Sequence, residues 1–421
     1  MNASALFFCH VPVQEIRKNK QKIALILFPP LFFLCLFSQN ALAQCSFSGE
    51  LIKRGAWGVA ESTGSPDKGC ELDTMFPPAS VIKIATVLAA LQILGPDYRF
   101  TTEFFLDGAN NLYIRGFGDP SLVSEEIALI TVRLHHLGLK QVNLLYIDSS
   151  AFALERQVPG REQSDNPYDA PIGPTVVNFN TASIYKDKHG NISSGEVQTP
   201  TLPLMHQLAA KRPSGHMLIN ICADGAEEDT RMARFTAEIF RAKLQGAGIS
   251  VRGIGGTRKV PSQLPLFHSH KSSKTLAEIS SDLLHSSSNF MANLVFLQSG
   301  AASYGFPATW EKGKMATQRE LTRLLGNKAA KEIHMIEGSG LSRNNRISAR
   351  ALLALLEHFS PYKGMLRLKN GLPIKSGTLS GVYNYAGYLD NGRPFVILLS
   401  QMKNTRDELL EKLRKQYGGK R

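Results

Sequence analysis

The chain has 421 residues and a formal charge of +13. This length exceeds one typical hydrophobic core, so two or more domains are expected. The basic balance concerns partners and solubility rather than fold, and nucleic acid is disfavoured as a partner because the sequence contains no aromatic-rich basic motif.

Residues 1–43 predict a cleaved export signal. Four cations within residues 17–22 precede an apolar stretch, residues 23–37, and Ala41-Leu42-Ala43 then offers an A-x-A cleavage site. The apolar stretch is interrupted by Pro29-Pro30 and is shorter than the roughly 20 residues that a membrane span needs. We therefore expect a periplasmic protein, cleaved near its A-x-A site, that associates with the membrane at most peripherally.

Export also governs what the cysteines can do. Cys45, Cys70 and Cys222 remain after residues 1–43 are removed. In an oxidising compartment Cys45 and Cys70 are candidates for a disulfide, which leaves Cys222 as the odd, buried residue. A lipid anchor on Cys45 is the alternative, but Gln44 is a poor fit to the small residue expected before it. Loss of four leader cations and one leader anion leaves a formal charge of +10, which suits an anionic cell envelope and equally a solvated surface.

The first candidate catalytic residues are Ser80 and Lys83. Lys83 is the only charged residue between Asp73 and Asp97, in a run, residues 80–91, that otherwise reads as a helix buried all round. Positions i and i+3 share a helix face, so the hydroxyl and the amine can meet. Desolvation lowers the pKa of a lysine, so Lys83 is a candidate neutral base for the serine proton. The alternative is a helix-end lysine that extends its amine to water.

Residues 101–264 mix strand-like and helical patterns. The strand-like runs are residues 142–147, 176–179 and 217–222, and the helical runs are residues 125–137 and 230–244. Gly246 ends the second of these helices. The glycine-rich residues 253–261 predict a loop before another helix at residues 276–284.

Two later motifs carry polar groups suited to the same chemistry as Ser80. Ser287-Ser288-Asn289 follows the helix at residues 276–284, and Lys375-Ser376-Gly377-Thr378 lies in a predicted strand, residues 372–378. Acyl transfer needs a base for the nucleophile, a proton donor for the leaving amine, and a cation with hydroxyl donors for a substrate carboxylate. The alternatives are a helix cap for Ser287 and Asn289 and a solvated strand-edge charge for Lys375. The joint occurrence of the motifs, in order and in fitting local structure, favours the catalytic interpretation.

The last part of the chain reads as the end of a domain. Gly377 has no side chain, so a bound peptide could approach that backbone closely. Residues 382–389 and 394–402 are strand-like, and Asp390-Asn391-Gly392 between them is a strong hairpin signal. Residues 405–417 predict a closing amphipathic helix.

The motifs S-x-x-K, S-x-N and K-[ST]-G, in this order, are the set found in penicillin-binding proteins and serine β-lactamases. The chain resembles the D-alanyl-D-alanine carboxypeptidase/endopeptidase family, the class C low-molecular-mass penicillin-binding proteins of peptidase family S13. Residues 116–122 look like that family's G-G-D-P-[ST]-L element, and residues 338–343 look like its G-S-G-L-S-R segment. Residues 375–389 are similar to the family throughout, and the resemblance runs from about residue 50 to about residue 400.

This resemblance implies an α/β (α+β) fold: a β-lactamase-like domain, with helices on both faces of an antiparallel sheet, that carries a large insertion. Roughly two hundred residues separate Lys83 from Ser287, far more than in class A β-lactamases, so an insertion of domain size is expected. We expect residues 44–100 and 265–421 to form a split serine DD-peptidase domain, and residues 101–264 to form the inserted domain or domains.

The resemblance also implies roles for the matching residues. Ser80 would be the nucleophile, Lys83 its base, Ser287 the proton relay to the leaving amine, and Asn289 the residue that orients lysine and substrate. The substrate's terminal carboxylate would be held by Lys375, Ser376 and Thr378. Backbone N–H groups of Ser80 and Thr378 would form the oxyanion hole.

A further implied residue lies in the segment Asp165-Asn166-Pro167-Tyr168-Asp169-Ala170-Pro171. It resembles the family region whose aspartate faces the substrate's side-chain amine, and Asp165 fits better than Asp169; an Asx-Pro turn is the alternative. The sequence departs from the family at three positions. Ser288 replaces an aspartate, Ser376 replaces a threonine, and Asn293 stands where an acidic residue is frequent.

The sequence thus predicts an exported serine DD-peptidase acting on peptidoglycan stem peptides, as a D-Ala-D-Ala carboxypeptidase, a cross-link endopeptidase or both. The acyl-enzyme would also form with β-lactams, as covalent inhibitors. The alternatives are a β-lactamase, for which no dedicated hydrolytic base is recognisable, and a weakly catalytic penicillin-binding sensor. No metal or other cofactor is expected, since no histidine pair stands at ligand spacing. The sequence does not indicate whether carboxypeptidase or endopeptidase activity dominates, or whether the protein forms a homodimer.

Overall fold

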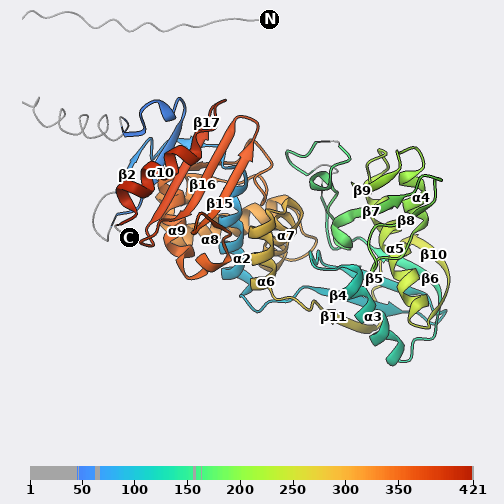
Figure 1. Cartoon of the computed structure of the whole chain (residues 1–421). Coiled ribbons are helices and arrows are strands. Elements are labelled where there is room, and N and C mark those ends of the chain that lie inside the picture. Colours follow the sequence, from blue (N-terminus) through green and yellow to red (C-terminus); the bar gives the residue numbers. More distant parts are fainter. Residues whose placement is uncertain (1–44, 46, 62–66, 155–157, 163, 420–421) are drawn as a thin grey trace, which may run out of the picture. The chain divides into compact units, whose positions relative to one another are not determined.

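The computed structural model describes residues 45, 47–61, 67–154, 158–162 and 164–419 (Figure 1). The predicted export signal, residues 1–43 with its cleavage site, lies outside the described residues. Across the described part of the chain, none of the helices has the length and apolar character needed to cross a membrane. Cys45 forms a disulfide with Cys70, which uses the sulfur that a lipid anchor would need, and Cys222 is a partly exposed free thiol.

Strands from both ends of the chain form one six-stranded sheet. Its order is β14-β15-β16-β17-β1-β2, and every neighbouring pair is antiparallel. In that order the strands are Leu368–Lys369, Leu372–Leu379, Val382–Tyr388, Pro394–Ser400, Gly55–Val59 and Lys68–Cys70. Trp57 of β1 lies opposite Ile397 of β17, so segments from opposite ends of the sequence are direct neighbours. The predicted antiparallel sheet is confirmed.

Helices cover both faces of this sheet (Figure 1). On one face α10 (Arg406–Tyr417) packs three leucines against the Trp57 side of the sheet. The other face carries the remaining helices of this part: α2 (Lys83–Leu94), α6 (Leu276–Ser286), α7 (Asn289–Tyr304), α8 (Trp310–Ala330) and α9 (Ala349–Phe359). Because α2 contacts all four of the others, its first nine residues are all buried, as the sequence predicts for this helix.

Short elements complete this part. A small sheet has the order β12-β13-β3, from Ile333–His334, Arg346–Ser348 and Met75–Phe76. The 3-10 helices here are η1 (Gly49–Leu51), η2 (Ala79–Ile82) and η5 (Ser360–Met365). Strand β3 leads directly into η2, which carries Ser80, so the small sheet anchors the turn that holds the candidate nucleophile.

A second, five-stranded sheet is built from the middle of the chain. Its order is β10-β6-β5-β4-β11, from Ser250–Thr257, Gln141–Asp148, Leu112–Gly116, Thr101–Leu106 and Leu266–Lys271. Strands β10, β6 and β5 run parallel, while β4 and β11 are antiparallel to their neighbours. Since β11 pairs with β4, this sheet continues past the domain boundary predicted at residue 264. The division into a split domain and an insertion stays a proposal.

Helices and a third sheet complete the middle of the chain. Helix α5 (Glu228–Gly246) packs on β10 and β6 and contacts α3 (Ser124–His136). The third sheet has the order β8-β7-β9, from Ile192–Ser194, Thr181–Lys186 and Gly215–Asn220, with α4 (Pro203–Ala209), η3 (Pro167–Asp169) and η4 (Asn178–Asn180) around it.

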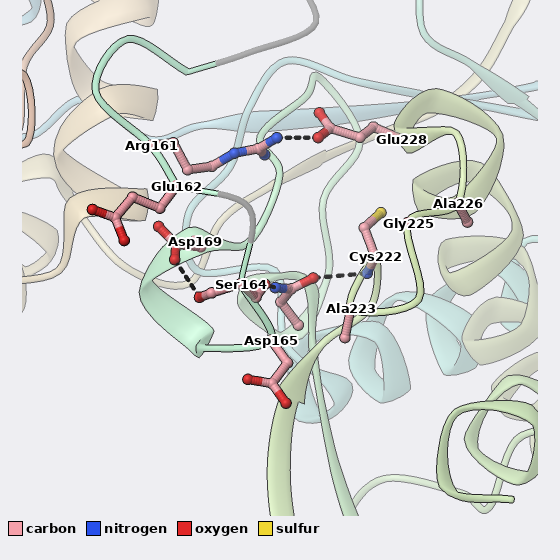
Figure 2. A pocket seen from close by; sticks show the side chains of 11 residues that line it. Arg161, Glu162, Ser164, Asp165, Asp169, Cys222, Ala223, Gly225, Ala226 and Glu228 are labelled. Atoms are coloured by element: carbon pink, nitrogen blue, oxygen red, sulfur yellow. Dashed lines mark hydrogen bonds and ion pairs between the residues drawn. The ribbon is translucent and has the colours of Figure 1, made fainter. Parts of the chain in front are cut away.

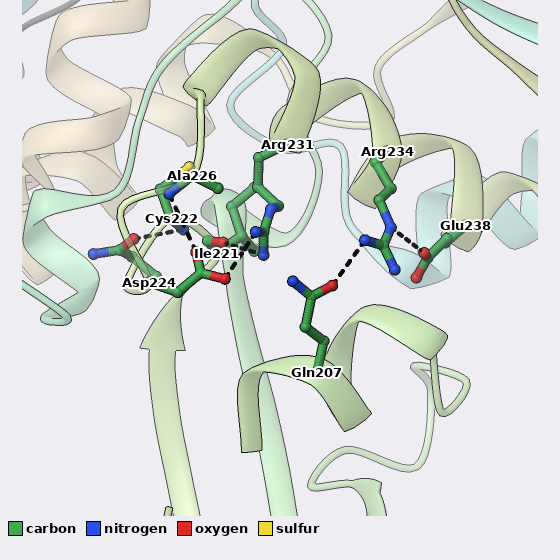
Figure 3. A network of polar contacts seen from close by, with 9 residues as sticks. Gln207, Ile221, Cys222, Asp224, Ala226, Arg231, Arg234 and Glu238 are labelled. Carbon is green, nitrogen blue, oxygen red and sulfur yellow. Dashed lines mark hydrogen bonds and ion pairs between the residues drawn. The ribbon is translucent and has the colours of Figure 1, made fainter. Parts of the chain in front are cut away.

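Polar contacts connect α5 to the segment after β9 and to α4 (Figure 3). Arg231 donates to Asp224 Oδ2 at 2.8 Å and to the Ile221 carbonyl at 3.3 Å. Arg234, one turn further along α5, donates to Glu238 Oε1 at 2.7 Å and to Gln207 Oε1 of α4 at 2.8 Å. The helix is thereby held at two successive turns.

Two predictions from this region are wrong. Residues 176–179 are not a strand: Asn178, Phe179 and Asn180 have φ of 46°, 57° and 50°, a left-handed backbone that asparagine tolerates better than most residues. The glycine-rich segment is not all loop, because residues 250–257 form β10. A Cβ at Gly255 would collide with the Tyr146 ring, so glycine there serves close strand packing rather than a turn.

Candidate active site

Ser80 and Lys83 lie where η2 joins α2. The turn is tight, since Ala79 has a left-handed φ of 47° and a Cβ at Gly340 would collide with the Ala79 carbonyl. Lys83 Nζ lies 2.9 Å from Ser80 Oγ, within hydrogen-bond distance. The i, i+3 spacing therefore brings the two groups together as expected.

The amine of Lys83 is enclosed by protein. The residue is 0% exposed, and Nζ also donates to Asn289 Oδ1 at 2.8 Å and to the Ser339 carbonyl at 2.6 Å. The alternative of a lysine that extends to water is therefore wrong. Burial, aided by the Lys375 charge and opposed by that of Glu337, holds the pKa of Lys83 well below its usual range. An uncharged amine at hydrogen-bond distance from Oγ can act as a general base.

The second motif, Ser287-Ser288-Asn289, forms the turn between α6 and α7. Ser287 has a left-handed φ of 59° at the end of α6, and Ser288 is the N-cap of α7, accepting from the Met291 N–H at 3.2 Å. The capping function thus belongs to the middle residue. The outer two point elsewhere: Asn289 bonds Lys83, and Ser287 Oγ accepts from Lys375 Nζ at 2.8 Å.

The third motif alternates along β15. Lys375 and Gly377 are buried on the side of η2, whereas Ser376 and Thr378 are exposed. A Cβ at Gly377 would stand 2.7 Å from the Pro78 carbonyl and 3.0 Å from the Ser80 N–H. The absence of a side chain is thus required by the approach of the strand to the turn of Ser80, a reason different from the predicted approach of a peptide. Burial lowers the pKa of Lys375 to about 8.

Asp165 lines a pocket formed by residues from the middle of the chain (Figure 2). Its carboxylate is half exposed and accepts from Arg212 Nη1 at 2.8 Å, and this arginine keeps the pKa of Asp165 below its usual range. Asp165 lines a cavity of about 410 Å³ together with Asp169, Arg161 and Cys222. Asp169 is buried and accepts from Ser164 through Oδ2, while its Oδ1 has no hydrogen-bond partner among the described residues. Burial raises the pKa of the Cys222 thiol to about 12.

Sequence reasoning missed Glu337, a fully buried carboxylate beside the site. It accepts from the N–H groups of Ser339 at 2.7 Å, Gly340 at 2.8 Å and Ser342 at 3.2 Å, and from Asn345 Nδ2 at 2.7 Å. Bonds to an ionised carboxylate are stronger than neutral ones. Glu337 thus fixes the loop whose carbonyl binds the lysine amine. In the sequence, Glu337 can be found as the acidic residue directly before the G-S-G-L-S-R segment. That segment was used only to identify the family resemblance.

The same loop explains Asn293, one of the departures from the family pattern. Asn293 is buried in α7, and its Oδ1 accepts from the Gly338 N–H at 2.9 Å, while Thr86 Oγ1 donates to the Gly338 carbonyl at 2.6 Å. An uncharged acceptor is sufficient for this contact. The loop is therefore held from two helices, which places the Ser339 carbonyl against Lys83.

Two further residues connect the sheet to the site. Asn384 of β16 is fully buried and donates to the carbonyls of Pro77 at 2.9 Å and Pro78 at 2.8 Å, so it ties the sheet to the turn before Ser80. Arg406, at the start of α10, donates to Thr378 Oγ1 at 2.7 Å. Neither was singled out from sequence. A buried asparagine within an apolar strand is the available signal for Asn384.

Comparison with known sequences settles the family. The D-Ala-D-Ala carboxypeptidase 3 (S13) family matches residues 56–215 and 227–374. The chain belongs to this family. The D-alanyl-D-alanine carboxypeptidase DacB of Haemophilus influenzae is 24% identical over 390 residues, covering 79% of this chain and 81% of that protein. The D-alanyl-D-alanine carboxypeptidase of an Actinomadura species is 25% identical over 382 residues, covering 74% and 70%.

Solved structures agree on the fold. Penicillin binding protein 4 of Haemophilus influenzae superposes with a TM-score of 0.67 at 20% identity, covering 89% of this chain and 98% of that one. A predatory endopeptidase of Bdellovibrio bacteriovorus, acylated by penicillin G, gives a TM-score of 0.51 at 15% identity, covering 87% and 93%. The predicted family, fold class and enzyme class, a serine-type DD-carboxypeptidase, are confirmed.

Proposed function

We propose that the chain is exported to the periplasm, loses residues 1–43, and cleaves peptidoglycan stem peptides with Ser80 as nucleophile. The observation that carries the proposal is the position of one buried amine, Lys83 Nζ, within 2.9 Å of both Ser80 Oγ and Asn289 Oδ1. Lys375 is bonded to Ser287 on the other side of the same site. Relatives of this chain carry the name D-alanyl-D-alanine carboxypeptidase, which supports D-Ala-D-Ala peptides as substrates.

In the proposed reaction, the Ser80 proton moves to Lys83 Nζ as Oγ bonds to the carbonyl carbon before the terminal D-alanine. Backbone N–H groups of Ser80 and Thr378 stabilise the oxyanion, a contribution of about 3 kcal/mol per donor in other enzymes. The C–N bond then breaks as the amine receives a proton through Ser287. Water hydrolyses the resulting ester and restores the Ser80 hydroxyl.

The substrate carboxylate is assigned to Lys375, Ser376 and Thr378. Two donors of the Lys375 ammonium are directed at Ser287 Oγ and the Ser376 carbonyl, at 2.8 and 3.1 Å. An ammonium has three donors, so one remains for a carboxylate. The exposed hydroxyls of Ser376 and Thr378 supply further donors on the same strand. β-Lactams, which carry a carboxylate and a strained amide, are the proposed covalent inhibitors.

Two rates measured on the wild-type protein test this function. We expect release of D-alanine from a stem pentapeptide to be much faster than hydrolysis of benzylpenicillin, with the penicilloyl group located by mass spectrometry on the tryptic peptide that contains Ser80. Rapid penicillin turnover would indicate a β-lactamase. A stable adduct without D-alanine release would indicate a penicillin-binding sensor.

Asp165 is proposed to bind the free amine of the stem's diamino acid. We expect Asp165→Asn to lower kcat/KM on such a peptide about tenfold and to leave benzylpenicillin acylation unchanged, because charge-assisted hydrogen bonds contribute about 1.5–3 kcal/mol and benzylpenicillin carries no amine. The ion pair with Arg212 must open for this contact, so Arg212→Gln is the matched variant and should not reduce peptide turnover. Equal loss on both substrates would make Asp165 structural, and no loss would move the role to Asp169.

Homodimer formation and peripheral membrane association stay predictions. Size-exclusion chromatography with light scattering measures the oligomeric state. Flotation with anionic vesicles measures membrane association.

A further inference from the structure

A second cavity opens at Ser287 and Lys375 and follows the beginning of β15. Its volume is about 390 Å³, within the range of about 300–1,000 Å³ common for ligand pockets. Besides Lys375, its lining includes three cations, Arg367, Lys369 and Arg406. Among the described residues that line it, none is an aspartate or glutamate. A cavity with this lining attracts anions.

Two of these cations, Arg406 and Lys369, lie against the ring of one tyrosine, Tyr385. The guanidinium carbon of Arg406 lies 4.5 Å from the centroid of the Tyr385 ring, and Lys369 Nζ lies 4.7 Å from the same centroid. Lys369 is paired with Asp407 at 2.7 Å, which lies outside the lining. Arg406 Nε is buried and has no hydrogen-bond partner among the described residues. Arg367 is exposed and lines the cavity, and its guanidinium makes no hydrogen bond or ion pair within the described part of the chain.

The position of the cavity relative to the chemistry decides what enters it. Ser287, the proposed relay to the leaving amine, belongs to its lining, and so do Lys375 and Ser376, the proposed carboxylate contacts. Atoms that continue beyond the leaving amine and its carboxylate therefore extend toward Arg367. Free D-alanine ends at that first carboxylate and would leave Arg367 without a ligand.

We propose that this cavity is a subsite for the leaving strand of a cross-linked peptide, which carries carboxylates beyond the one bound at Lys375. The inference rests on the proposed function and specifies its substrate as an anionic, branched peptide. The reaction is balanced as before: the Ser80 Oγ–carbon bond forms, the amide C–N bond breaks, and the leaving amine of the diamino acid takes the proton. Water then hydrolyses the ester.

The test compares two substrates on matched variants. Purified cross-linked muropeptide dimer and monomeric pentapeptide are digested by wild type, Arg367→Gln, Arg367→Glu and Lys363→Gln, and products are quantified by liquid chromatography with mass spectrometry. Lys363 is an exposed cation of η5 outside the cavity and serves as the control. We expect the ratio of kcat/KM for dimer to that for pentapeptide to fall about tenfold in Arg367→Gln and further in Arg367→Glu, since a charged hydrogen bond corresponds to about this factor. Lys363→Gln should keep the wild-type ratio.

The outcomes separate the subsite from the proposed function. An unchanged ratio in both Arg367 variants, or an equal fall in Lys363→Gln, overturns the subsite. A wild-type protein that releases D-alanine from pentapeptide but leaves the dimer intact also overturns the subsite and keeps the proposed function. A wild-type protein that neither releases D-alanine nor is labelled by penicillin overturns the proposed function, and the subsite with it.

Discussion

Ser80→Ala is expected to abolish covalent labelling by penicillin while the protein stays folded. The hydroxyl is the only proposed nucleophile, so its removal leaves nothing that can form the ester. The fold should persist because the hydroxyl makes one described contact, to Lys83, and loss of a single hydrogen bond costs about 1 kcal/mol. Labelling is measured with a fluorescent penicillin on denaturing gels, and stability by thermal unfolding followed by circular dichroism.

Ser299→Ala is the matched control for this prediction. Ser299 is a buried serine of α7 whose hydroxyl donates to the Val295 carbonyl of its own helix at 2.9 Å. The control should label like wild type. Adduct formation in Ser80→Ala, located on any other residue, would contradict the assignment of the nucleophile.

Lys83→Arg is expected to reduce the rate constant of acylation by about 10³-fold. A positioned general base contributes about 10²- to 10⁴-fold, and arginine keeps its proton throughout the accessible pH range. Lys83 itself can lose its proton, because burial and the nearby charge of Lys375 lower its pKa. The rate constant comes from stopped-flow measurements with a chromogenic cephalosporin.

Lys83→Met and the pH profile accompany this measurement. Methionine removes both charge and base in a chain of similar length, so equal loss in both variants shows that the proton acceptor matters. Wild-type acylation should increase as Lys83 deprotonates and decrease above a pH of about 8, where Lys375 loses the charge that holds the substrate carboxylate. If Lys83→Arg acylates within a few-fold of wild type, Lys83 supplies only positive charge.

The candidate catalytic residues were predictable because their chemistry is local. Ser80 and Lys83 lie one helical turn apart, and spacing alone places them on one face. The other motifs also occur where the sequence places them: Ser287 and Asn289 follow the predicted helix that is α6, and Lys375 lies in the predicted strand that is β15. Their roles in catalysis stay predictions until the variants are measured.

Contacts across long sequence separations were not predictable. Lys83 meets Asn289 and Ser339 at separations of 206 and 256 residues, and no spacing rule specifies either. The partner of Asp165 shows the same difficulty, since Arg212 is 47 residues away. The glycine-rich composition of residues 253–261 indicates a loop, but part of this segment is in β10. There Gly255 leaves room for the Tyr146 ring, a contact that composition does not reveal.

The neighbouring positions of β1 and β17 bear on when the catalytic centre can form. A chain made and translocated from its N-terminus presents Ser80 long before the last strand is available. The amine of Lys83 is enclosed only after the segment of Ser339 arrives, and β1 gains its second neighbour only with residues 394–400. Such late, non-local pairing makes folding slow. The catalytic centre is therefore assembled only after the C-terminal strands of the chain have been made.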